Sequence, residues 1–184
     1  MLKIETGMLL YHGSYAAVPQ IDLKMCRKGK DFGRGFYLTS SLSQARAFVP
    51  LSVQRKYGIV KAGSVGVVNT YRVRDVIGLQ EYIFSEANKE WLHFVSANRR
   101  KGLFRDMIEE FKCYDVIVGK IANDQTARTL QLYVEGAYGE PGTEQADNFV
   151  ISLLLPNRLS NQFCFRTEKS ISCLEFVRSD EYRV

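Results

Sequence analysis

The chain has 184 residues, of which 46% are hydrophobic and 24% are charged. This length suffices for one domain with a hydrophobic core, and the composition argues against an extended disordered chain. No apolar run approaches the ~18 residues that cross a membrane, and residues 1–6 lack the apolar stretch of a secretory signal. We therefore expect a single cytoplasmic domain over residues 1–184 that does not associate with a membrane.

The net charge is +5, with an isoelectric point near 9.0. This excess would ease contact with nucleic acid or an acidic partner. The basic residues look spread out, with local clusters only at 24–30 and 98–101, so the charge favours such a partner only slightly. Two histidines and four cysteines without zinc-type spacing predict no metal site. Cys164 and Cys173 lie in apolar runs and are expected to be buried thiols.

In chain order, residues 8–11 predict a short buried strand that leads into His12, and residues 13–34 predict a loop. Residues 35–39 predict a second strand. Ser41 and Gln44 have the spacing of a capping box, so a helix should begin there. Its apolar side chains fall at helical spacing and should share one face: Leu42, Ala45, Phe48 and Val49.

The remaining chain alternates between strand and helix patterns. Strands are expected at 64–73, 114–121, 161–166 and 173–177. A helix over 88–100 should bury Trp91, Phe94 and Val95, and Asp124 should cap a second helix that aligns Ala127, Leu130 and Val134. A third helix carries Ala146, Phe149, Val150, Leu153 and Leu154 at helical spacing, and Pro156-Asn157 should end it. The sequence therefore predicts an α+β domain with helices inserted between strands.

Two motifs place glycines beside a histidine and aromatic residues: Tyr11-His12-Gly13-Ser14 and Asp31-Phe32-Gly33-Arg34-Gly35-Phe36-Tyr37-Leu38-Thr39. This mixture suits a flat ligand with polar edges. Each residue alone is more often structural: the histidine hydrogen-bonded, the tyrosine in the core, the glycines in turns. The glycines at 33 and 35 do not form the G-x-G-x-x-G pattern of a Rossmann site. The order and spacing of the two motifs, with Phe48 eleven positions after Tyr37, are more informative.

This arrangement resembles the NAD-binding half of the ADP-ribosyltransferase superfamily, in its His-Tyr-Glu branch of diphtheria-toxin-like and PARP-like proteins. The third signature element of that branch is a glutamate on a late strand, where this chain has Asn161-Gln162-Phe163-Cys164-Phe165. Nearly the whole chain is similar to a bacterial family of unknown function placed in this superfamily, which also carries a late glutamine. The resemblance implies one ADP-ribosyltransferase-like domain with split mixed or antiparallel β-sheets and inserted helices.

The resemblance also implies roles for individual residues. His12 would bond to the adenosine ribose, and the Gly13 backbone would pair with the nicotinamide carboxamide. Tyr37 would stack on the nicotinamide ring, with Phe48 on its other face. Asp31 would position the turn at Gly33 and Gly35, and Arg34 would meet the pyrophosphate. Ser14, Phe36 and Ala45 complete the expected NAD-binding set, Ala45 standing where relatives often have a serine.

Gln162 would hold the nicotinamide ribose by hydrogen bonding, together with His12 and Tyr37 as the catalytic set, but it carries no negative charge. The resemblance therefore implies NAD-dependent mono-ADP-ribosyl transfer to a protein or nucleic-acid acceptor, with release of nicotinamide, in a bacterial toxin or effector neutralised by a small partner. NAD would be the co-substrate, without a metal. Two alternatives stay open: a non-catalytic module that binds NAD, another nucleotide or a protein, and a transferase that modifies nucleic acid.

Overall fold

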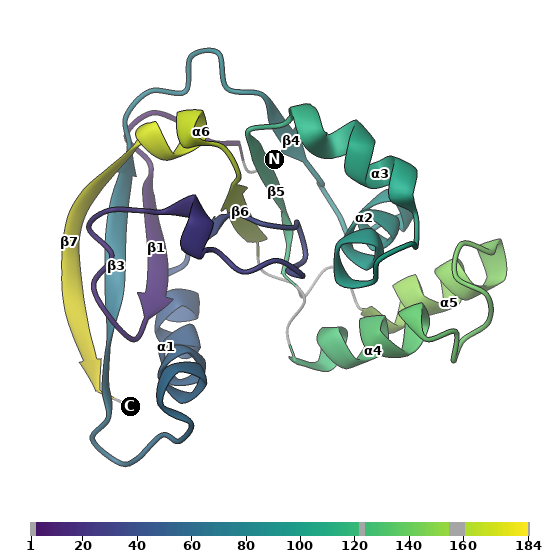
Figure 1. Cartoon of the computed structure of the whole chain (residues 1–184), viewed down its shortest axis with the longest axis horizontal. Helices are drawn as coiled ribbons and strands as arrows, with labels where there is room; N and C mark the ends of the chain where they lie inside the picture. Colours follow the sequence, from purple (N-terminus) through teal and green to yellow (C-terminus); the bar gives the residue numbers. More distant parts are fainter. Residues whose placement is uncertain (1–2, 122–123, 155–160, 184) are drawn as a thin grey trace.

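The computed structural model describes residues 3–121, 124–154 and 161–183, and it has an α+β fold with two β-sheets (Figure 1). The first sheet has the strand order β1 (Leu9–Ser14), β3 (Val65–Val73) and β7 (Leu174–Arg183). The second sheet has the order β2 (Phe36–Leu38), β6 (Asn161–Phe165), β5 (Val116–Lys120) and β4 (Glu81–Ile83). The expected combination of helices with mixed and antiparallel sheets is confirmed at this level.

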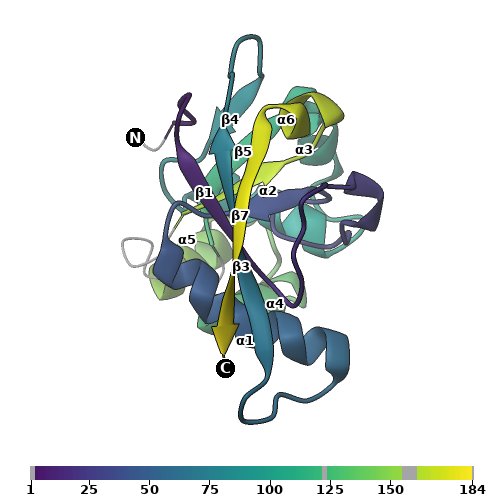
Figure 2. The ribbon, with the colours of Figure 1, turned by 90° about the vertical axis from the view of Figure 1, so that its left-hand side faces the viewer.

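Among the described strands, pairing is antiparallel except between β4 and β5, which run parallel. The two sheets share a hydrophobic core, and Figure 2 shows β7 and β3 of the first sheet in front of β4 and β5. The apolar side chains between them alternate along their strands, as expected for half-buried strands. They include Leu10, Phe36, Leu38, Tyr71, Val116 and Phe163.

Helices connect the strands. They are α1 (Leu42–Tyr57), α2 (Lys89–Arg99), α3 (Arg105–Glu110), α4 (Asp124–Val134), α5 (Glu144–Leu154) and α6 (Glu168–Ser172), with short 3-10 helices η1 (Leu23–Met25) and η2 (Phe111–Cys113). Helices α2 to α5 lie beyond the second sheet (Figure 1), where they enclose an aromatic core. Helix α1 packs on the first sheet through Ala45, Val49 and Val53. None of the described helices is long and apolar enough to cross a membrane.

Helix α1 begins where the sequence predicts, but its cap and its face differ from the expectation. The Ser41 hydroxyl accepts a hydrogen bond from the backbone N–H of Gln44 at 3.3 Å. The reciprocal half of the capping box is absent, because the Gln44 side chain accepts from the Thr39 hydroxyl at 2.7 Å instead. Ala45 and Val49 are buried, whereas Leu42 and Phe48 are 37% and 38% exposed, so the predicted apolar face is only partly covered.

Helix α2 matches the prediction closely. Asn88 caps it by accepting from the Trp91 N–H at 3.0 Å, and Trp91, Phe94 and Val95 are fully buried. In α4, Leu130 and Val134 are buried, whereas the side chain of Asp124, the predicted cap, lies outside the described residues. The same is true of Pro156-Asn157, the predicted end of α5.

In α5 the predicted apolar face is only half covered. Ala146, Val150 and Leu154 are buried, but Phe149 and Leu153 are 48% and 44% exposed. Among the two cysteines expected to be buried, Cys164 is fully buried, and burial raises the pKa of its thiol to about 12, which makes it unreactive. Cys173 is partly exposed, contrary to the prediction.

Several elements were not predicted or differ in length. Strand β4 and helices α3 and α6 were missed because they are short, as were the two 3-10 helices. Strand β1 continues to Ser14, so the predicted loop begins later than residue 13. This extension matters for function because it puts His12 and Gly13 inside a strand. Strand β7 likewise continues to Arg183.

Candidate functional site

The candidate site begins where β1 and β2 separate. The backbone groups of Tyr11 and Thr39 exchange two hydrogen bonds, of 2.7 and 3.0 Å, which join the two sheets at one point. Along a strand the N–H and C=O groups of alternate residues point to the same edge. The backbone groups of Gly13 therefore point to the edge that faces β2, as those of Tyr11 do, and away from β3. No described residue pairs with Gly13 on that edge.

Gly13 is buried, and the space over its Cα is filled by helix α1. A Cβ atom at this position would lie 2.1 Å from the backbone oxygen of Ala45 and 3.3 Å from a methyl group of Val49. The close approach of α1 to β1 therefore requires a glycine here. An N–H and a C=O that are buried but lack a protein partner are costly, so this edge is suited to a ligand that supplies both an acceptor and a donor.

His12 reaches from β1 to β2. Its Nδ1 lies 2.9 Å from the backbone oxygen of Tyr37, and its ring lies 4.6 Å from the ring of Phe36. Because a carbonyl oxygen can only accept, Nδ1 carries the proton and Nε2 of the neutral ring is an acceptor. Burial lowers the pKa of His12 below its ordinary value of 6.5, and the hydrogen bond to Tyr37 opposes this effect only partly.

Tyr37 fixes the loop that precedes it. Its hydroxyl donates to the backbone oxygen of Gly33 at 2.8 Å and accepts from the N–H of Phe32 at 3.0 Å. The pKa of Tyr37 is raised well above its ordinary value, mainly by burial, so the phenol stays protonated. Gly33 has a φ of +80°, and a Cβ there would lie 2.7 Å from the Asn98 side chain. The turn therefore requires a glycine at position 33 for two reasons: its φ is positive, and a side chain there would collide with Asn98.

Gln162 is tied to the same loop through Asp31. The Gln162 Nε2 donates to Oδ2 of Asp31 at 3.1 Å and to the backbone oxygen of Lys120 at 3.4 Å. Both neighbours are acceptors, which orients the amide so that its Oε1 points elsewhere. The Arg99 guanidinium donates to Oδ1 of Asp31 at 3.0 and 2.5 Å. Arg99 therefore neutralises Asp31, and together they hold the side chain of Gln162 in one orientation.

Arg34 and Gly35 have structural contacts in the loop. The Arg34 guanidinium donates to the backbone oxygens of Leu23 and Lys24, at 2.9 and 2.5 Å, so it holds η1 against the 31–35 turn. A Cβ on Gly35 would lie 2.5 Å from the sulfur of Cys164. Neither contact tests a role for these residues in binding a ligand.

The other predicted residues are distributed around this centre. Ser14 is buried, and its hydroxyl accepts from the N–H of Ala16 at 3.4 Å. Phe36 lies in the core between the sheets and touches His12, and Ala45 packs its backbone on Gly13. Phe48 lies at the surface, with the guanidinium of Arg55 5.4 Å from its ring centre. The structure thus joins His12 to Tyr37 and Asp31 to Gln162, while Phe48 and Tyr37, both described residues, form no ring contact with each other.

Two polar clusters in the described residues were not foreseen. Arg99 belongs to a basic cluster that the sequence shows, but its pairing with Asp31 spans 68 residues and has no local signal. The fully buried Asp147 accepts hydrogen bonds from the Tyr133 hydroxyl and from His93, the latter at 2.7 Å. His93 also stacks on Phe104, with ring centres 3.9 Å apart. This second cluster fastens α2 to α4 and α5, away from His12.

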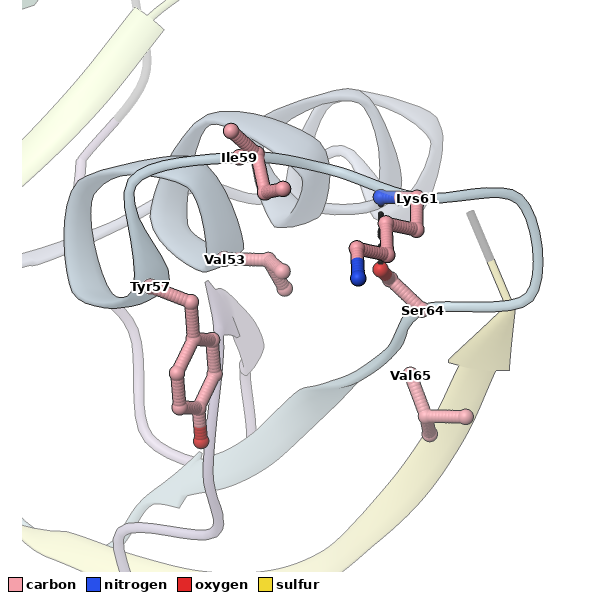
Figure 3. A pocket seen from close by; sticks show the side chains of 6 residues that line it. All are labelled: Val53, Tyr57, Ile59, Lys61, Ser64 and Val65. Carbon is pink, nitrogen blue, oxygen red and sulfur yellow. Dashed lines mark hydrogen bonds between the residues drawn. The ribbon is translucent and has the colours of Figure 1, made fainter.

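Within residues 3–121, 124–154 and 161–183, no three histidine, cysteine or acidic side chains are grouped as a metal site would require. A hollow of about 500 Å³ lies between the end of α1 and the start of β3 (Figure 3). Its lining residues are Val53, Tyr57, Ile59, Lys61, Ser64 and Val65. None of them belongs to the predicted motifs.

Comparison with known proteins is consistent with the whole-chain pattern but assigns no activity. Neither the curated proteins nor the solved structures gave a match. The sequence model of one family, described as "Protein of unknown function (DUF3990)", matches residues 8–176. The match covers most of the chain, and the protein therefore belongs to the DUF3990 family.

Proposed function

We propose that this protein is an NAD-dependent mono-ADP-ribosyltransferase of the His-Tyr-Glu type, which its sequence resembles. The observation that carries the proposal is that Gly13 is buried and that its N–H and C=O point to the β2 side of β1, where no described residue pairs with them. A primary carboxamide offers one carbonyl acceptor and an NH₂ donor. It would form hydrogen bonds with both the N–H and the C=O of Gly13, as the nicotinamide carboxamide does in the proteins that this chain resembles.

His12 and Tyr37 supply the groups that surround this edge. The Nε2 of neutral His12 is free to accept from a ribose hydroxyl, because Nδ1 is held by the Tyr37 carbonyl. The Tyr37 ring is fixed by the two hydrogen bonds of its hydroxyl, and an aromatic face suits the cationic nicotinamide ring. The bond between the nicotinamide and the ribose of bound NAD would break, nicotinamide would leave, and the ADP-ribosyl group would become bonded to a nucleophilic atom of the acceptor, which loses a proton. The chain's own residues orient NAD and hold the ring.

Gln162 supports transfer of a single ADP-ribose rather than polymer synthesis. Its Nε2 is committed to Asp31 and Lys120, which leaves Oε1 to accept a hydrogen bond from a ribose hydroxyl. A neutral amide positions the sugar but gives no full charge to a developing cation. We therefore expect slow turnover, to a protein or nucleic-acid acceptor that the site itself does not identify.

The test is binding and turnover of NAD by the purified protein. Calorimetry should show NAD binding by the wild type, and His12→Ala and Tyr37→Leu should each weaken it at least tenfold. Tyr57→Ala is the matched control, since Tyr57 is an exposed aromatic residue on α1 outside the proposed site. Absence of binding by folded wild type, or equal loss in the Tyr57 variant, would contradict the proposal.

A non-catalytic NAD-binding role is the second candidate. It is favoured because the third signature position carries the neutral Gln162 in place of a glutamate. The Gln162 amide nitrogen also donates a hydrogen bond to Asp31. The two functions differ in turnover. The protein is incubated with NAD and with cell extract as the source of acceptor, and liquid chromatography measures the nicotinamide that is released. Release is expected for the transferase and not for the binding module.

A toxin or effector role belongs to the same proposal. If the transferase acts inside bacteria, expression of the wild type should slow growth, whereas His12→Ala, produced at the same level, should not. Co-expression of a small inhibitory partner should then restore growth. Equal growth of both strains would contradict the toxic role without touching NAD binding.

A further inference from the structure

The charge of this protein is segregated along the chain, contrary to the expectation that its basic residues are spread out. Between Leu23 and Arg74 there are eleven lysines and arginines and a single carboxylate, Asp31, so this segment carries +10. The whole chain carries +5, so the remainder carries −5. The one carboxylate is already paired with Arg99. The segment therefore holds a large excess of positive charge.

The fold gathers part of this charge beside helix α1. Lys30 is half-buried, and its pKa is lowered by burial first and then by the nearby guanidinium of Arg55, with Arg27 and Arg99 contributing less, while the Asp31 carboxylate opposes the shift. Lys30 therefore lies near a cation of α1 although 25 positions separate them. Within the described residues Lys30 forms no ion pair. Grouped cations of this kind attract an anion.

Exposed aromatic rings lie among these cations. The Lys56 ammonium is 5.1 Å from the ring centre of Tyr15, and the Arg55 guanidinium is 5.4 Å from that of Phe48. Tyr15 also meets Tyr57 edge to face, with ring centres 6.2 Å apart. Tyr15, Phe48 and Tyr57 are 40%, 38% and 62% exposed. We call Lys30, Arg55, Lys56 and Lys61 with these three rings the basic face.

The hollow of Figure 3 lies at the end of the basic face. Tyr57 and Lys61 line it together with the exposed apolar side chains of Ile59 and Val65. It is a surface depression that combines an aromatic ring, apolar walls and an ammonium group. Such a surface fits a planar base whose phosphate is nearby.

We propose that the basic face binds single-stranded nucleic acid. Cations that follow a backbone, with aromatic rings on which bases stack, are the two components of sequence-tolerant single-strand binding. An acidic protein would use the cations but would leave the exposed rings without flat partners. This binding goes beyond the transfer reaction and does not depend on NAD. If the protein both transfers ADP-ribose and binds nucleic acid, then nucleic acid is the class of acceptor that the basic face would bring to the NAD site.

The experiment measures fluorescence anisotropy of a short labelled single-stranded RNA and its DNA equivalent, without NAD, between about 50 mM and about 200 mM salt. The test variant is Arg55→Gln/Lys56→Gln/Lys61→Gln. The matched control is Lys101→Gln/Arg105→Gln/Lys112→Gln, which removes the same charge near α3, at the other end of the molecule from α1 in both views (Figures 1 and 2). All six side chains are exposed, so both variants should fold.

Loss of three phosphate contacts should reduce the slope of log affinity against log salt by about 2, at about 0.7 for each contact. The control should keep the wild-type slope. Tyr57→Ala should bind about tenfold more weakly through lost stacking, whereas Tyr57→Phe should bind like the wild type. This pair tests the rings separately from the charge.

Three results would overturn the proposal. They are wild-type binding that ignores salt or is absent, equal losses in the two triple variants, and displacement of the oligonucleotide by poly-glutamate as readily as by unlabelled RNA. The last result would assign the basic face to an acidic protein. All of these measurements are made without NAD, so they can be interpreted even if the protein does not bind NAD. The nucleic-acid proposal and the NAD proposal are therefore tested separately.

Discussion

The amide nitrogen of Gln162 donates to the Asp31 carboxylate at 3.1 Å, across 131 positions of the chain. Asp31 is in turn held by the Arg99 guanidinium. The position at which the transferases that this sequence resembles carry a glutamate is therefore adjacent to an existing carboxylate. A second carboxylate at position 162 would face a like charge, so glutamine is the compatible residue in this protein.

Gln162→Glu is therefore expected to destabilise the protein by about 1–3 kcal/mol, because the donor to Asp31 is lost and two carboxylates approach each other. The loss should be larger at pH 8 than at pH 5, where the introduced carboxyl can bind a proton. Urea unfolding at the two pH values measures it.

The double variant Asp31→Asn/Gln162→Glu tests the same pair from the other side. It restores one donor and one carboxylate, so it should be more stable than the sum of the two single variants predicts, by about 1 kcal/mol. Additive losses would show that the two side chains are not coupled.

Tyr37→Phe removes the hydroxyl that bonds to Phe32 and Gly33. We expect a loss of about 1–2 kcal/mol in unfolding free energy, with NAD affinity within a few-fold of wild type because the ring remains. Tyr37→Leu keeps apolar volume but removes the ring, so its NAD affinity should fall further. Equal affinity of the two variants would argue against stacking.

Gly13→Ala should be poorly tolerated because its Cβ would lie 2.1 Å from the Ala45 oxygen. We expect at least about 1–3 kcal/mol of destabilisation from this overpacking. Gly58→Ala is the control: its Cβ would meet nothing within 4 Å, and only its φ of +84° is unfavourable, at about 1 kcal/mol. Thermal unfolding of both variants compares them, and a Gly13 variant no less stable than the Gly58 one would contradict the close packing of α1 on β1.

The lowered pKa of His12 makes folding stability depend on pH. The unfolded chain binds a proton near the ordinary value of 6.5, whereas the folded chain binds it only at lower pH. The stabilisation from neutral His12 is therefore complete above pH 6.5 and is lost as the pH falls through the lowered pKa. His12→Gln should flatten this part of the curve in urea unfolding. Comparing wild type with the variant isolates the contribution of His12, and identical slopes would contradict the lowered pKa.

The sequence predicts best those elements whose signals are local. The spacing of Trp91, Phe94 and Val95 defines α2, and the structure buries these three residues and has Asn88, the predicted start of the helix, as its cap. In α5 the spacing places Phe149 and Leu153 on the same apolar side as Ala146 and Val150, but it cannot say how much of that side a neighbour covers. These two residues are exposed because packing partners come from distant parts of the chain.

The candidate site shows the same division. The motifs point to His12, Gly13 and Tyr37, and the strand that carries the first two residues is longer than its apolar run suggests. The free edge of Gly13 follows from the pairing of Tyr11 with Thr39. The bond from Gln162 to Asp31 likewise depends on β6 lying next to β2. Neither relationship has a signal in the local sequence.

The most direct test of the central proposal is the amide signal of Gly13 in the nitrogen–proton NMR spectrum during titration with NAD. If the nicotinamide carboxamide completes the free edge of β1, this signal should shift further than those of His12 and Ser14, whose amides face β3. The Tyr57→Ala variant should give the same shift. Saturation with NAD while the Gly13 signal stays in place, or no binding at all, would contradict the proposed site.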